Sequence, residues 1–244
     1  MSTEKRLDWT QLQRCLWRLH REAQPFLRRA LLIGGGACLF YRARLQQVAD
    51  PDFRVPQLSD ALEAKWLSKD LDFTGIFSGD ALVLLPGMVV TDPTGRPHLE
   101  VEGIRLGFAE VGLTLDPEVA MERARSCEFE WNSERVQFLV ADPVSLHREK
   151  TALVERRNQT SDLLHLALLG DYVAWELVTA VERLSQTDTE LDLTDAKELI
   201  SVVTDVSRRA PVVARDPRVL RRLGPHLEAP TELAATLNRI IRPS

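Results

Sequence analysis

Apolar residues recur at helical spacing in the first part of the chain. Within residues 8–23 they return every three or four positions while the arginines fall on a different face, which predicts an amphipathic helix. Pro25 should end this helix, and residues 26–33 then read as a short buried strand. A helical pattern resumes at residues 37–48, after a run of three glycines.

The texture of the chain changes in its middle third. A proline-containing loop at residues 49–59 and a short helix at residues 60–67 come first. From Lys69 to Val140 the chain consists of short apolar or alternating runs divided by Gly and Pro. These runs predict strands at residues 70–75, 81–90, 98–108 and 135–140, with a turn at 91–97 and a helical insertion at 116–126.

The last hundred residues carry helical patterns only. Asp216 followed by Pro217 is typical of a helix start, and Gly224 followed by Pro225 is typical of its end. Either Asp192 or Thr194 opens another helix. We therefore expect an α+β fold, with a mixed β-sheet flanked by helices in residues 1–142 and a helical C-terminal domain in residues 143–244.

Composition narrows the class of protein. With 244 residues, 44% hydrophobic and 27% charged, the chain is long enough to bury a sizeable core and has the composition of a soluble globular protein. A net charge of −5 argues against a protein that is basic overall and wraps nucleic acid. The three cysteines match no zinc or disulfide spacing, so we expect reduced thiols.

The cellular location follows from the same reading. The first ten residues, "MSTEKRLDWT", are charged and lack an apolar core, so we expect no signal peptide. The longest apolar stretches look too short to cross a bilayer. The prediction is a cytoplasmic protein that does not interact with membranes.

The glycine run "LLIGGGACLF" at residues 31–40 is the first candidate for chemistry. It lacks the lysine of a Walker loop, and Leu39 replaces the third glycine of a dinucleotide fingerprint. It is typical either of an ordinary tight turn or of a turn whose backbone N–H groups, at the start of a helix, hold a phosphate.

A pair of aspartates follows in "SKDLDFTG", residues 68–75. On a strand, Asp70 and Asp72 point to the same side, while the apolar residues between and after them face the core. The pair is either a solvated acidic face or a site for Mg²⁺ or Mn²⁺, which favour carboxylate and phosphate oxygens. In "HLEVEGI", Glu100 and Glu102 share a face and offer a third carboxylate for a metal site.

The order of these motifs resembles the nucleotidyltransferase superfamily, and the nearest likeness is to its abortive-infection (AbiEii-like) branch. The resemblance rests on "GGGACLF", "SKDLDF" and "LEVEGI", and on "DPVSLHREKTALVERRNQTSDLLHL" further along the chain. It covers roughly residues 30–170. Two positions of the last segment differ from the family, which often has an arginine and an acid where this chain has Ser161 and His165.

The resemblance implies a set of site residues. Asp70, Asp72 and Glu102 would be catalytic and would bind the metal, with Glu100 as the alternative to Glu102. The residues implied to bind the nucleotide are Gly34, Gly35, Gly36, Lys150, Arg157 and Asp162. His165 either hydrogen-bonds with Asp162 or is an interhelical histidine with other partners.

The implied function is a Mg²⁺-dependent (or Mn²⁺-dependent) nucleotidyltransferase. Such an enzyme moves a nucleoside monophosphate from a nucleoside triphosphate to a hydroxyl group of RNA, of a protein or of a small molecule. The branch also implies a toxin or defence role with an antitoxin partner. The alternative, motivated by the departures from the family pattern, is a catalytically degenerate protein of the same fold that binds a nucleotide or a partner.

Arginines crowd the last helices. They are either a surface that contacts RNA or a solvated face held by salt bridges, and the sequence leaves both interpretations open. The residues concerned are Arg208, Arg209, Arg215, Arg218, Arg221 and Arg222.

Overall fold

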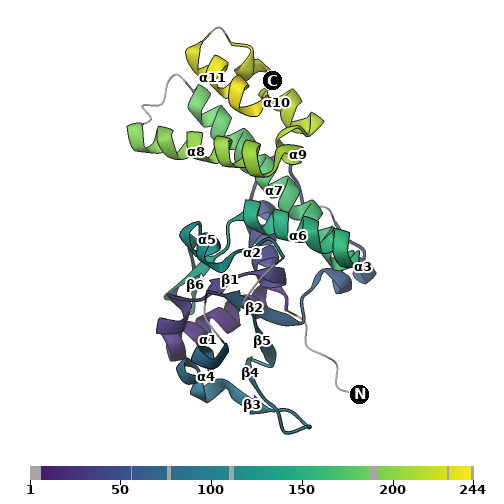
Figure 1. Cartoon of the computed structure of the whole chain (residues 1–244), viewed down its shortest axis with the longest axis vertical. Helices are drawn as coiled ribbons and strands as arrows, with labels where there is room; N and C mark the ends of the chain where they lie inside the picture. Colours follow the sequence, from purple (N-terminus) through teal and green to yellow (C-terminus); the bar gives the residue numbers. More distant parts are fainter. Residues whose placement is uncertain are drawn as a thin grey trace.

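The computed structural model describes residues 7–55, 57–75, 78–109, 113–186, 192–229 and 231–242. Within them, a seven-stranded mixed sheet is flanked by helices, and only helices follow the last strand (Figure 1). This confirms the predicted α+β class with a helical C-terminal region. The last strand ends at Val140 and the next helix begins at Pro143, but the division into two domains stays a prediction.

The first helix is longer than predicted. Helix α1, Trp9–Leu27, begins where the Asp8 side chain accepts a hydrogen bond from the backbone N–H of Gln11. The chain kinks at Ala23 (φ −150°, ψ 47°), and the helix resumes through Pro25. The break at Ala23 lies where the sequence pattern ended the helix, but a second helical stretch continues beyond it to Leu27. The strand expected at residues 26–33 is only the two-residue β1, Leu31–Leu32.

The glycine run lies inside a helix. Helix α2, Gly34–Gln46, takes all three glycines into its first turn, whereas the sequence pattern placed the helix after them. Gly34 has a φ of +62°, a conformation that favours glycine over any residue with a Cβ atom. The helix packs on strand β2, Asp70–Thr74, and on the long helix α7, Thr160–Ser185. Helix α3, Asp60–Trp66, forms as predicted.

Strand β2, Asp70–Thr74, lies in the middle of the sheet. The strand order is β3-β4-β5-β2-β1-β7-β6. β2 pairs antiparallel with β1 and parallel with β5, Ile104–Phe108, and β1 pairs parallel with β7, Glu134–Val140. Leu71 and Phe73 of β2 are fully buried, which confirms the alternation expected for this strand.

Two predictions for the middle of the chain are wrong. Residues 81–90 form the end of helix α4, Ser78–Leu84, a short 3₁₀ helix, η1, Pro86–Met88, and the start of strand β3, Val89–Thr91. Apolar runs of this length do not distinguish a buried helix from a buried strand. The segment 98–108 is not one strand but two, β4, Pro97–Val101, and β5, joined by a tight turn.

A further strand, which the sequence pattern did not predict, follows the helical insertion. Helix α5, Pro117–Glu122, ends earlier than the predicted 116–126, and the edge strand β6, Arg125–Trp131, follows it. β6 pairs antiparallel with β7 along its whole length. Its apolar residues Cys127, Phe129 and Trp131 do alternate, so the sequence held a signal for this strand.

The remaining elements are helices. They are α6, Pro143–Arg157; α7, Thr160–Ser185; α8, Leu193–Arg209; α9, Pro211–Ala214; α10, Pro217–Leu227; and α11, Glu232–Ile241. Asp192 caps α8, which decides between the two predicted helix starts, and Asp216 caps α10 as predicted. The predicted end at Pro225 is wrong, since the helix continues to Leu227, a buried residue that follows Leu223 on the apolar face.

Helix α7 connects the sheet to the C-terminal helices (Figure 1). It is the one helix in the described part of the chain that is long and apolar enough to cross a membrane by length and composition, contrary to the expectation from the sequence. More than half of its apolar window is buried, and it contacts α2, α3, α6, α8 and α10. This packing is that of the core helix of a soluble protein. All three cysteines are free, as expected.

Helix α10 is tied by ion pairs to the loop between α2 and α3. The Arg222 guanidinium lies 3.2 Å from Asp50 and 3.3 Å from Asp52, both in that loop. Arg218 lies 2.7 Å from Asp171 of α7. These two arginines therefore belong to a face held by salt bridges, one of the two interpretations that the sequence left open.

Candidate functional site

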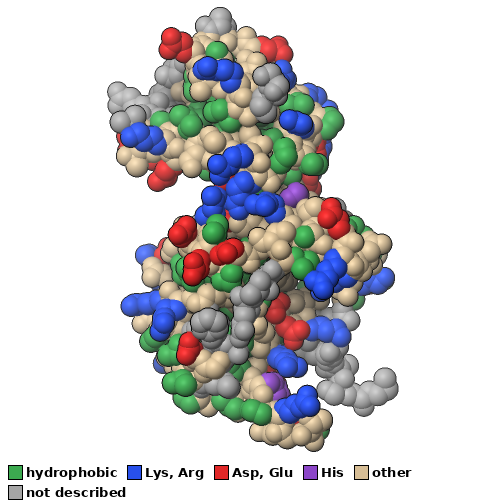
Figure 2. Space-filling view, viewed as in Figure 1, with side chains coloured by type: hydrophobic (Ala, Val, Ile, Leu, Met, Phe, Trp, Pro, Cys, Tyr) green, Lys and Arg blue, Asp and Glu red, His purple; other side chains and the backbone are tan. Residues whose placement is uncertain are grey.

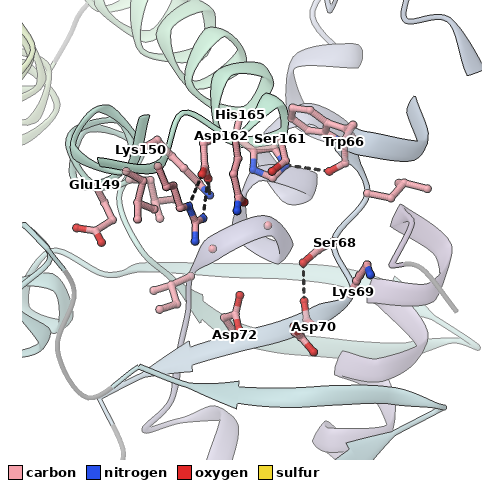
Figure 3. A pocket seen from close by; sticks show the side chains of 18 of the residues that line it. Trp66, Ser68, Lys69, Asp70, Asp72, Glu149, Lys150, Ser161, Asp162 and His165 are labelled. Atoms are coloured by element: carbon pink, nitrogen blue, oxygen red, sulfur yellow. Dashed lines mark hydrogen bonds and ion pairs between the residues drawn. The ribbon is translucent and has the colours of Figure 1, made fainter. Parts of the chain in front are cut away.

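A cavity of about 640 Å³ opens between the sheet and the helices α2, α6 and α7 (Figure 3). Its walls come from the first turn of α2, the segment from α3 into β2, one face of α6 and the first turn of α7. Of the predicted site residues, those that line it are Gly34, Gly35, Asp70, Asp72, Lys150, Arg157 and Asp162. Segments more than a hundred residues apart in the sequence thus meet in one place.

Asp70 and Asp72 form the acidic wall of the cavity. Both project from the same face of β2, as the strand geometry predicted, and Figure 3 shows them opposite Lys150 and Asp162. Burial, and next the neighbouring Asp70, raise the pKa of Asp72 above its usual range. Two close carboxylates of this kind favour a cation between them.

Glycines enclose the carboxylate of Asp72 on two sides. A Cβ atom on Gly34 would lie 2.5 Å from one oxygen of Asp72, and a Cβ on Gly107 of β5 would collide with the other. Gly107 is paired with Asp72 across the parallel strands. Sequence reasoning missed Gly107, although an isolated glycine in a strand is a known sign of close approach by another group.

The other two glycines serve different purposes. A Cβ on Gly35 would lie 2.6 Å from the Cβ of Ser68, so the absence of a side chain lets α3 and β2 approach the helix at the cavity wall. Gly36 does not line the cavity. A Cβ there would face Leu32 and Leu71 at 3.0 Å, so its predicted nucleotide contact is replaced by a packing role in the core.

Lys150, Arg157 and Asp162 form the opposite wall. Lys150 Nζ donates to Asp162 Oδ1 at 2.8 Å, and Arg157 Nε donates to Asp162 Oδ2 at 2.6 Å. Burial opposes ionisation of Asp162, but hydrogen bonds from Arg157 and Lys150 lower its pKa to about 2. Lys150 and Asp162 are buried, whereas Arg157 is 45% exposed and reaches the cavity from its rim. The cluster carries two positive charges and one negative charge, so this wall is basic.

Two helices also point their N-terminal turns at the cavity. Gly34 and Gly35 open α2, and Thr160 to Asp162 open α7; both first turns line the cavity. In neither helix does the N-cap side chain accept a hydrogen bond from the first turn. Backbone N–H groups and the helix dipole therefore add to the attraction for an anion.

The third predicted carboxylate is absent from the site. Glu102 lies in the tight turn after β4 with a φ of +53°, not on a strand, and its carboxylate pairs with Arg18 at 3.0 Å. The prediction that it joins Asp70 and Asp72 at a metal is therefore corrected. The turn was not foreseen because "LEVEGI" alternates like a continuous strand.

The alternative residue, Glu100, does not reach the site either. In the sheet, Glu100 of β4 lies beside Arg105 of β5, and Arg105 lies beside Asp70 of β2. Glu100 is therefore two strands away from Asp70, about 10 Å at the usual strand spacing. Glu100 does not line the cavity. No group of three His, Cys, Asp or Glu residues suited to a metal ion occurs among the described residues.

His165 contacts α3 and not Asp162. Its Nε2 lies 2.9 Å from the carbonyl oxygen of Trp66, so this nitrogen carries the proton and donates. The rings of His165 and Trp66 pack edge to face, with 4.4 Å between their centroids. Burial, and next the charge of Lys150, lower the pKa of His165 to about 3, so the ring is neutral. Of the two possibilities left open, the interhelical histidine is confirmed.

Glu149 is a cavity residue that the sequence did not indicate. Its carboxylate accepts hydrogen bonds from the backbone N–H groups of Leu113, Thr114 and Leu115. Although burial opposes ionisation, these bonds hold the pKa of Glu149 below its usual range. Glu149 therefore fixes the segment that carries Leu115 into the cavity wall.

Comparison with known proteins adds little to this geometry. No family model matches the sequence, and no curated protein matches it. The crystal structure of an antigenic nucleotidyltransferase-like protein from Paracoccidioides brasiliensis aligns over 96% of this chain and 95% of that one, with a TM-score of 0.31 and 12% sequence identity. Values this low do not establish a shared fold or activity.

Proposed function

We propose that the protein is a nucleotidyltransferase that depends on a divalent metal ion. One observation carries the proposal: a single cavity places two aspartates on one wall and a lysine and an arginine on the opposite wall. A nucleoside triphosphate bound with a divalent cation needs both kinds of charge, cationic groups for the phosphates and carboxylates for the metal.

The carboxylates present fit one metal ion. Asp70 and Asp72 are adjacent on one face of β2. Burial raises the pKa of Asp72, and a bound cation would offset this cost of ionising its carboxyl. Mg²⁺ is commonly held by one or two carboxylates plus substrate phosphates. When bound, such an ion neutralises negative charge on the phosphates. The site offers no third carboxylate from Glu102 or Glu100, so the proposal does not include a protein-built clamp for two metals.

The chain's own residues bind and orient the substrate. Arg157 and the first turns of α2 and α7 would hold the phosphates, and Lys150 adds a positive charge fixed in place by Asp162. The acceptor hydroxyl oxygen would form a bond to the α-phosphorus while the bond from that phosphorus to the bridging oxygen breaks. Pyrophosphate leaves and the hydroxyl proton passes to water.

The direct test is transfer of label. The protein is incubated with each α-labelled nucleoside triphosphate, Mg²⁺ or Mn²⁺, and a cell extract, and the labelled products are separated. We expect metal-dependent transfer that Asp70→Asn and Asp72→Asn abolish. Transfer that is unaffected by both substitutions, or the absence of any labelled product, would count against the proposal.

The second candidate is a binding protein without chemistry. It is favoured by one observation, the absence of the predicted Glu102 from the cavity, since its carboxylate pairs with Arg18. It predicts that calorimetry detects triphosphate binding while the label assay stays silent. The AbiEii-like branch, with its toxin role and antitoxin partner, stays a prediction from the motifs, and copurification with the product of a neighbouring gene is its test.

A further inference from the structure

A groove lined by basic residues runs along the side of the molecule next to the cavity. It consists of a hollow of about 560 Å³ between β6 and α8 and a hollow of about 290 Å³ between α5, α6 and α8. Arg123 and Arg208 line both hollows, so the two are continuous, and we call them together the waist groove. Figure 2 shows Lys and Arg side chains gathered at this waist, below the C-terminal helices. Its basic residues are Arg123, Arg125, Arg148, Lys197, Arg208 and Arg209.

The waist groove and the cavity share walls. Leu115 lines both, and helix α6 presents Glu149 and Lys150 to the cavity but Ser145 and Arg148 to the groove. Residues 148 and 150 are two positions apart on the helix, so their backbones lie within one helical turn, roughly 5 Å. A long ligand in the groove would therefore end beside the proposed catalytic cavity.

Charges in the groove are unequally balanced. Asp205 pairs with Arg123 and Arg209, each at 2.7 Å, and Arg125 pairs with Glu176. Arg209 also contacts Asp142 at 3.4 Å. These pairs neutralise the inner part of the groove.

Three cations at the outer part are uncompensated. Within the described ranges, Arg148, Lys197 and Arg208 make no ion pair with a protein carboxylate, and all three are exposed. Asp116, at the same end of the groove as Arg148, is engaged in capping α5 through the N–H groups of Glu118 and Val119. A local excess of positive charge on a protein of net charge −5 is an attraction site for a polyanion.

The dimensions indicate a chain of phosphates and not a single one. Lys197 and Arg208 lie eleven residues apart on α8, which is about 16 Å along the helix axis. Ser201 and Thr204, also on the groove side of α8, place hydroxyl groups between them. Two cations with two hydroxyl groups between them over this length suit the repeated phosphates of a strand.

We propose that the waist groove binds the phosphodiester backbone of a nucleic acid strand and so guides the acceptor to the cavity. The guiding part of this inference rests on the proposed nucleotidyltransferase function, whereas strand binding itself does not. RNA and DNA share the phosphate chemistry that the groove recognises, and the experiment separates them.

The test measures strand binding without nucleoside triphosphate. Fluorescence anisotropy follows a labelled 12-nucleotide RNA and a DNA of the same sequence at several salt concentrations. The double variant Arg148→Ala/Arg208→Ala should bind the preferred strand at least fivefold more weakly. The slope of log affinity against log salt should fall by about 1.4, since each phosphate of a single strand that the variant no longer binds contributes about 0.7. Comparing the RNA and DNA arms shows which sugar is accepted.

The matched control replaces two exposed arginines outside the groove, Arg135→Ala/Arg156→Ala, and should keep affinity within twofold. Failure of the wild-type protein to bind either strand, or an equal loss in the control variant, would overturn the inference. So would a phosphoserine peptide that binds the wild-type protein more tightly than either strand and loses affinity in the groove variant.

Calorimetry with a nucleoside triphosphate distinguishes failure of this inference from failure of the proposed function. Triphosphate binding that persists in the groove variant, together with its weakened strand binding, supports a separate groove. Triphosphate binding without any strand binding overturns the groove alone. Absence of triphosphate binding by the wild-type protein overturns the proposed function and the guiding role, whatever the strand assay shows.

Discussion

The carboxylate of Asp72 occupies the space in which a side chain on Gly107 would lie. The two residues are register partners on the parallel strands β2 and β5, and Gly34 bounds the same carboxylate on its other side. The acidic wall of the cavity therefore depends on two glycines that carry no chemistry of their own.

Replacing Gly107 by alanine tests this dependence. The added methyl group collides with an oxygen of Asp72, so the carboxylate must rotate. We expect a loss of about 1–3 kcal/mol in the free energy of unfolding from overpacking, and Mn²⁺ affinity at least tenfold lower by electron paramagnetic resonance. Gly87→Ala is the control, because a Cβ there meets nothing within 4 Å. Equal Mn²⁺ affinity in the two variants would contradict this account.

Substitution of the three acidic candidates tests whether the site contains two carboxylates, as in the structure, or also Glu102, as the sequence predicted. Asp70→Asn or Asp72→Asn should lower label transfer by about 100-fold or more, because each removes a charge from the cavity. Glu102→Gln should keep transfer within threefold, because Glu102 faces Arg18 outside the cavity. If Glu102→Gln were as inactive as the aspartate variants, a third carboxylate would have to reach the site.

Asp162 links stability to pH. Because Lys150 and Arg157 lower its pKa from 3.8 to about 2, the ionised carboxylate stabilises the folded protein fully above pH 3.8, and this stabilisation is lost as the pH falls toward 2. Asp162→Asn leaves Lys150 buried without its partner, so it should cost about 3–5 kcal/mol in the free energy of unfolding at pH 7.

Urea denaturation from pH 7 to pH 3 checks this linkage. The difference in the free energy of unfolding between wild type and Asp162→Asn should be constant above pH 5 and should narrow below pH 4. Asp60→Asn, on an exposed helix turn, is the control and should show little difference at any pH. If the difference in the free energy of unfolding between wild type and Asp162→Asn widened on acidification, the pKa of Asp162 would not be lowered in the folded protein.

Glu149 gives a prediction about local order. The substitution Glu149→Ala removes the carboxylate that accepts hydrogen bonds from the backbone N–H groups of residues 113–115. These amides should exchange with deuterium faster, and the free energy of unfolding should fall by about 1–3 kcal/mol. Glu155→Ala, at an exposed position of the same helix, serves as the comparison. Unchanged exchange at residues 113–115 in Glu149→Ala would rule out the clamping role.

Local patterns predicted the parts of the site that depend on one element at a time. The alternation in "DLDFT" placed Asp70 and Asp72 on one face. Lys150, Arg157 and Asp162 were implied by the resemblance, as parts of one helix, but the structure divides them between α6 and α7. The resemblance then brought both sets together, and the cavity shows them on opposite walls.

The parts that the sequence did not predict depend on neighbours. The prediction for Glu102 failed because this residue adopts a left-handed backbone conformation, with a φ of +53°. The strand ends there, although the alternating sequence pattern continues past it. Gly107 and Glu149 were missed because their roles depend on contacts with other segments, with Asp72 of β2 and with residues 113–115. Residues 81–90 were misread because helix and strand bury an apolar run equally well.

The ion pairs between α10 and the loop after α2 have a consequence for how the molecule is divided. That loop leads through α3 into β2, so Arg222, near the end of the chain, anchors the route by which the backbone arrives at Asp70. A fragment that stops after the sheet would keep Asp70 and Asp72 but would lose these ion pairs. The C-terminal helices thus hold the segment that leads into the acidic wall of the cavity.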